Sequence, residues 1–120
     1  MTRCLYGVEG LAEPLTPEAV SAIPSLLDES WRALLKVGEC RGYRAGASFA
    51  LACKTEMGER LLVKVSAVLG DPLRGPPRAR IEFSIQGENP YDVVRALEAL
   101  GSAARARGYS LQLSPQGRHQ

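Results

Sequence analysis

The 120-residue sequence contains little histidine and cysteine and no long apolar run. Its one histidine, His119, and its three cysteines, which have no CxxC spacing, predict neither a metal site nor a disulfide framework. We therefore expect the cysteines to be reduced and buried as small apolar side chains. No run approaches the ~20 apolar residues of a membrane span, and the first ten residues lack the apolar region of a secretory signal. These absences predict a cytoplasmic protein without a membrane partner.

The sequence also lacks the signatures of common enzyme classes. It has no GxxxxGK[ST] phosphate-binding loop, no HExxH zinc helix and no GxSxG nucleophile turn. Paired carboxylates such as Asp28–Glu29 are typical of a solvated surface. We therefore expect no cofactor and no metal and favour a non-enzymatic role. Chemistry by cysteine, arginine and glutamate without a motif stays open as a minority alternative.

The remaining composition is that of an ordinary globular domain, with 45% hydrophobic and 23% charged residues. A chain of this length buries roughly two-thirds of its unfolded surface, which is enough for one core. We predict a single domain over residues 1–114 and a polar tail over 115–120. Twelve of the fifteen cations are arginine, and Asn89 is the only asparagine. Abundant charge with little asparagine is compatible with a thermophilic source.

Alternation of apolar and polar residues predicts several strands. It is clearest over residues 79–86, where odd positions are apolar and even positions polar, so one face is buried and the other wet. Weaker patterns of the same kind predict strands over residues 2–8, 47–53, 61–69 and 109–113.

Helical spacing of apolar residues predicts three helices. A Thr-Pro pair at 16–17 begins the first helix, which Pro24 ends or kinks within two turns. The second covers about 25–37. The third, over 90–107, has the strongest signals, because Asn89 can cap it and a proline follows in its first turn.

The predicted order is therefore β-α-α-β-β-β-α-β. It indicates an α+β fold in which helices pack on one face of an antiparallel sheet of four to five strands. The small residues Ala50 and Ala52 fall on the face away from the helices. They would permit close approach of a helix, a ligand or a second subunit.

Seven residues form a candidate binding surface in the second half of the chain. They are Arg74, Arg78, Arg80, Glu82, Ser84, Arg105 and Arg107. Arginine suits phosphate contacts, so RNA is one candidate partner. A solvated surface is the alternative, and no aromatic platform supports stacking of single-stranded bases, because Phe83 falls on the buried face.

The leading interpretation is a small non-enzymatic binding or assembly module that self-associates, as a homodimer, or joins a larger complex through a protein partner. The alternative is a basic RNA- or ribonucleoprotein-contacting module. The order helix, three strands, helix resembles a double-stranded RNA-binding domain, but residues 90–107 lack the lysine cluster that such domains place in their last helix.

A second resemblance covers residues 58–100. The turn Gly87-Glu88 and the pair Leu97-Glu98 in the following helix are similar to the small accessory domain of lipoate–protein ligases. This chain departs from that pattern at Asn89-Pro90, where the accessory domain has an aromatic pair. The resemblance implies an accessory domain of an acyl-transfer ligase, and no functional residue is carried over from it.

Overall fold

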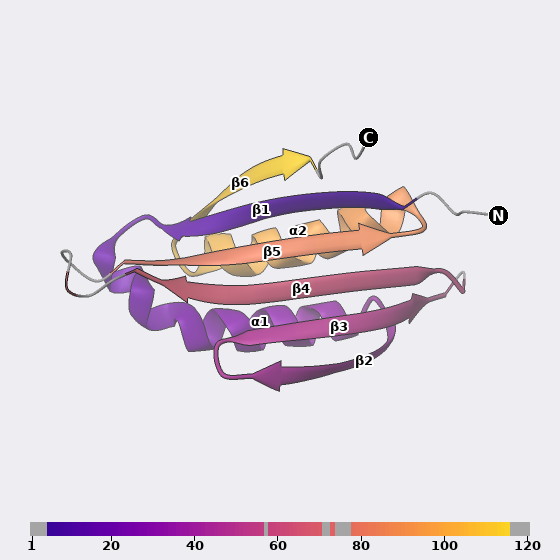
Figure 1. Ribbon diagram of the computed structural model, residues 1–120, viewed down its shortest axis with the longest axis horizontal. Coiled ribbons are helices and arrows are strands. Elements are labelled where there is room, and N and C mark those ends of the chain that lie inside the picture. Colours follow the sequence, from indigo (N-terminus) through magenta and orange to yellow (C-terminus); the bar gives the residue numbers. More distant parts are fainter. Residues whose placement is uncertain (1–4, 57, 71–72, 74–77, 116–120) are drawn as a thin grey trace.

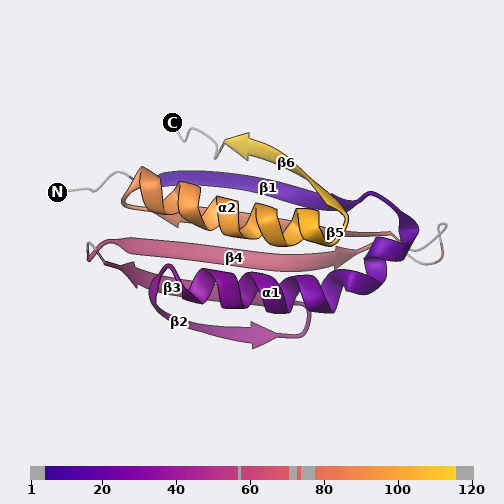
Figure 2. The same cartoon turned by 180° about the vertical axis from the view of Figure 1, so that it is seen from behind.

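The computed structural model describes residues 5–56, 58–70, 73 and 78–115. The strands are β1 (Tyr6–Pro14), β2 (Gly38–Ala45), β3 (Ser48–Thr55), β4 (Arg60–Leu69), β5 (Ala79–Gly87) and β6 (Tyr109–Pro115). A short 3₁₀ helix (Pro17–Ala22) leads into helix α1 (Ile23–Leu35), and helix α2 (Pro90–Ala106) connects β5 to β6. Within these residues the strands form one antiparallel sheet in the order β2-β3-β4-β5-β1-β6. Both helices lie on the same face of it (Figures 1 and 2).

The predicted α+β class, with helices on one face of an antiparallel sheet, is confirmed. The predicted number of strands is wrong, because the sheet has six. The additional strand is β2, which lies at the edge and contains Gly38 and Gly42. An edge strand buries few side chains, so its sequence carries little alternation. Strand β1 also continues to Pro14, whereas the prediction ended this strand at residue 8.

The predicted break near Pro24 is confirmed to within two residues, because the 3₁₀ helix ends at Ala22 and α1 begins at Ile23. Pro24 lies in the first turn of α1, directly after the 3₁₀ helix. A proline at this place removes only a backbone N–H that would have no partner within the helix, so it is compatible with the start of α1. The predicted start of the last helix is confirmed, since the Asn89 side chain accepts a hydrogen bond of 2.9 Å from the Tyr91 N–H.

The core lies between the sheet and the two helices. Alternate strand residues point toward the helices and are almost fully buried; they include Leu51, Leu61, Val63, Val65, Ile81, Phe83 and Ile85. They meet Leu26 and Leu34 of α1 and Ala96 and Leu100 of α2. These buried residues make up only one face of the sheet. The strand residues that alternate with them in sequence point away from the helices.

A disulfide between Cys40 and Cys53 joins β2 to β3. The two residues lie directly opposite each other in the strand register. The expectation of reduced thiols is therefore wrong for this pair. Its 13-residue separation gave no recognisable motif, because hairpin register and not local spacing brings the sulfurs together. Cys4 lies outside the described residues.

Tyr109 closes the core at the start of β6. It is 1% exposed, and its hydroxyl donates a hydrogen bond of 2.7 Å to the carbonyl oxygen of Ala19. Burial raises the pKa of Tyr109 above its usual value of 10.0. The folded chain therefore holds this proton more tightly than the unfolded chain does.

Replacing both Cys40 and Cys53 by alanine should lower the free energy of unfolding by about 3 kcal/mol, the value for a closed loop of roughly this length. Urea unfolding of the oxidised protein measures this loss. Reductant should destabilise the wild type and leave the double variant unchanged. Two alkylatable thiols at positions 40 and 53 in the untreated protein would contradict the pairing.

Tyr109→Phe should lower the free energy of unfolding by about 1 kcal/mol at neutral pH, because the hydrogen bond to Ala19 is lost. The stability that Tyr109 owes to its raised pKa is present below about pH 10 and is lost as the pH rises further. Urea unfolding from pH 8 to 11 should therefore show a steeper decline for the wild type than for the variant. Tyr91→Phe is the control, since Tyr91 is 78% exposed; an equal change for both variants would rule out a role of burial.

Candidate binding face of the sheet

The face of the sheet that points away from the helices is uncovered in the described part of the chain (Figures 1 and 2), and we call it the open face. Strand register aligns its side chains in rows across the sheet. One row crosses all six strands and comprises Tyr43, Ala50, Lys64, Ser84, Glu9 and Ser114. The position of Ala50 and Ala52 on this face confirms the prediction from their alternation with buried Leu51 and Cys53.

Two shallow depressions cover much of the open face. The first, of about 570 Å³, lies over β4, β5, β1 and β6 and is lined by polar side chains that include Glu9, Lys64, Glu82 and Gln112. The second, of about 350 Å³, lies over β2, β3 and β4. Its lining includes Tyr43, Ala50, Ala52 and Leu62. Lys64 borders both depressions, so polar and apolar sections form one continuous surface.

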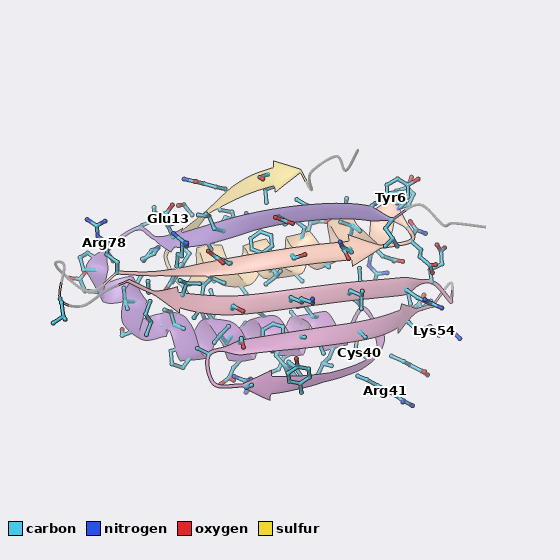
Figure 3. The ribbon with its side chains drawn as sticks, viewed as in Figure 1. Tyr6, Glu13, Cys40, Arg41, Lys54 and Arg78 are labelled. Atoms are coloured by element: carbon cyan, nitrogen blue, oxygen red, sulfur yellow. A yellow bond between two sulfur atoms is a disulfide. The ribbon has the colours of Figure 1, made fainter. Side chains whose placement is uncertain are left out.

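The charged side chains of the open face are divided between its two halves. On β2, β3 and β4 the charged strand residues are Arg41, Lys54, Arg60, Lys64 and Glu39, which give a net charge of +3. On β5, β1 and β6 they are Glu9, Glu13, Glu82 and Arg80, which give −2. Figure 3 shows Arg41 and Lys54 beside β2 and β3, and Glu13 at the opposite side on β1. One half is therefore basic and the other acidic.

The structure divides the predicted binding residues between two layers. Arg80, Glu82 and Ser84 lie on the open face, as the alternation in β5 predicts. Arg105 and Arg107 lie at the C-terminal end of α2, in the helix layer.

Two members of the predicted binding set remain. Arg78 directly precedes β5, and Arg74 lies outside the described residues.

Two of the predicted arginines are engaged in ion pairs. Arg80 donates to Glu82 through Nε at 2.9 Å and Nη2 at 2.8 Å. Arg107 lies 3.6 Å from a Glu29 carboxylate oxygen and donates to the Ser25 hydroxyl. These pairs reduce the positive charge that is available to a phosphate backbone, so RNA contact stays a prediction.

Sequence reasoning missed several residues of the open face. Arg41 and Tyr43 belong to the unpredicted strand β2, and Glu9 and Glu13 belong to the part of β1 that follows residue 8, where the predicted strand ended. The alternation from residue 8 to residue 13 is weak, because the apolar Leu11 lies on the same side of the strand as Glu9 and Glu13. Gly10 and Ala12 are too small to mark a buried face by themselves.

The described residues contain no group of three or more histidine, cysteine or acidic side chains that could hold a metal ion. Nor does that part of the chain include a helix of sufficient length and apolarity to span a membrane.

Comparison with known proteins finds two solved structures that align with this chain at low identity. No family model and no curated protein matches the chain. Among solved structures, the aminobenzoyl-glutamate utilization protein of Klebsiella pneumoniae aligns with 96% of this chain at 16% identity and a TM-score of 0.48. The chain spans only 28% of the length of that protein.

An adenosylmethionine decarboxylase from Aquifex aeolicus VF5 aligns with 96% of this chain and 93% of its own length, at 12% identity and a TM-score of 0.39. At such identities and scores, neither structure carries an argument about the function of this chain.

Proposed function

We propose that this protein is a binding or assembly module whose working surface is the open face of the sheet. The observation that carries the proposal is the apolar content of a face that neither α1 nor α2 covers. Leu62 is 42% exposed and Tyr43 68% exposed, and the small residues Ala50 and Ala52 lie between them in the register. A sheet face that is exposed only to water would carry polar residues at all of its positions.

The arrangement of these residues suits contact with another protein surface. Two alanines on β3 leave room for the backbone or side chains of a partner, and the neighbouring leucine and tyrosine offer apolar area. Charged side chains surround this apolar section, as in the polar rim of many interfaces. The partner in this proposal is a protein, either a second copy or another subunit of a larger complex. The proposed location is the cytoplasm, where disulfides such as Cys40–Cys53 occur mainly in proteins of hyperthermophiles.

We favour binding over catalysis because the charged groups of the open face are solvated. Arg80 and Glu82, which meet in an ion pair, keep 51% and 47% of their side-chain surface exposed. Exposed pairs are screened by water and contribute little energy. An active site instead places its charged groups where water is excluded.

Leu62→Glu should abolish the native assembly, because a carboxylate would occupy the apolar section of the open face. Size-exclusion chromatography with light scattering on extracts of the source cells, using a tagged chain, measures this. Val94→Glu is a matched control, since Val94 is an aliphatic residue on α2 that is 51% exposed. We expect the wild type and Val94→Glu to migrate above the monomer mass and Leu62→Glu to migrate at it.

A wild-type chain that is monomeric in extracts of its own cells would contradict this proposal. Equal loss of assembly in the Leu62→Glu and Val94→Glu variants would do the same, because it would place the contact outside the open face. Circular dichroism of both purified variants checks that each is folded.

A further inference from the structure

We propose that the open face binds the open face of a second copy of this chain, through a two-fold axis that runs parallel to the strands between β4 and β5. This inference rests on the proposed function and names its partner. Three observations support it: the division of charge, the register of the central strands and the area of the face.

The division of charge makes the open face complementary to itself. A two-fold axis parallel to the strands and central in the sheet places the β2–β4 half of one copy over the β5–β1–β6 half of the other. Residues keep their heights along the strands in this arrangement, so the opposite charges that it brings near each other are Lys64 of one copy and Glu82 and Glu9 of the other, twice in one symmetric contact. An axis in the same plane but perpendicular to the strands would instead place each half over the same half of the second copy. The basic halves would then face each other, as would the acidic halves. Charge therefore selects the first arrangement, which is a closed two-fold dimer.

The register identifies the charged pair that such a dimer brings together. An axis parallel to the strands keeps each residue at its own height along them, so a row of one copy faces the same row of the other. Lys64 on β4 then faces Ser84 of the second copy on β5, with Glu82 two residues away on that strand. Packed sheets twist by about 30° relative to each other, which displaces outer strands more than central ones. Lys64 and Glu82 lie on the two central strands, where this displacement is smallest.

The outer strands of the two copies also fit in size. In the same row, Ala50 on β3 faces Glu9 of the second copy on β1. A small side chain thus lies opposite a long one. Direct contact between two sheets at about 10 Å requires such interdigitation of the facing side chains.

The face is also large enough for a stable dimer. Six strands with a spacing of about 4.8 Å and about eight residues at 3.3 Å each cover roughly 600–800 Å². Two copies would bury at least about 1,200 Å², which reaches the range of about 1,200–2,000 Å² for specific interfaces.

Charge reversal on the purified full-length chain tests the arrangement. Lys64→Glu and Glu82→Lys should each weaken the dimer at least about tenfold in Kd, because each variant alone places like charges opposite one another. An equimolar mixture of the two variants should recover a heterodimer. In that heterodimer the two substituted side chains carry opposite charges and face each other across the interface, and the unchanged Lys64 of one chain faces the unchanged Glu82 of the other.

Sedimentation velocity and native mass spectrometry measure the Kd and the 1:1 composition of the mixture. Lys36→Glu and Glu98→Lys, both exposed in the helix layer, are the controls and should dimerise like the wild type.

A second measurement does not depend on variants. In the wild-type dimer, Lys64 should be shielded from reductive methylation while Lys36 reacts freely. Dilution below the Kd should make Lys64 reactive.

The outcomes separate this inference from the proposed function. A purified wild type that stays monomeric at about 100 μM, or a mixture of the two variants that stays monomeric although the wild type dimerises, would overturn the face-to-face dimer. If Leu62→Glu still abolished the assembly in cells, the open face would remain the working surface and its partner would be a different protein. If Leu62→Glu left that assembly intact, both the open face as working surface and the face-to-face dimer would be contradicted.

Discussion

Packing of α1 and α2 against one face of the sheet is the interaction on which the rest of the structure depends. The buried set that includes Leu51, Val63, Val65 and Ile81 can reach the helices only if their sequence neighbours point the other way. A shift of one residue in any strand would move the buried set to the open face, so burial of the core also fixes which side chains the open face presents. The composition of the open face is thus a consequence of the core, and its mixture of alanine, leucine, tyrosine and charged residues is determined together with it.

The edge strand β2 shows how the fold holds a segment that buries little. The disulfide ties Cys40 to β3, and Arg44 forms an ion pair with Asp28 of α1. The Arg44 guanidinium also lies 5.9 Å from the ring centre of Trp31, which packs edge-on against Phe49. These contacts fix β2 from the helix side of the sheet, and its other side remains available to present Arg41 and Tyr43.

The charge division of the open face has the same origin. Strand β1 lies between β5 and β6, although it is first in the sequence, and it brings Glu9 and Glu13 next to Glu82 and its neighbours. The basic residues come instead from three consecutive strands at the opposite side of the sheet. The net charge of the chain, +2, conceals this separation, because the two halves largely cancel. A surface of this kind attracts a copy of itself more strongly than a uniformly charged one, which is the physical basis of the dimer we propose.

The sequence by itself determined the fold class, the alternation in β5, the cap at Asn89 and the placement of Ala50 and Ala52 away from the core. All of these are local properties, since they follow from period-two burial or from backbone groups a few residues apart. Only the tertiary structure decided the existence of β2, the pairing of Cys40 with Cys53, the place of β1 between β5 and β6 and the grouping of charges into two halves. Each of these depends on which distant strands pair and in which register, and the free energy that selects the pairing comes from the shared core and not from the residues of any one segment.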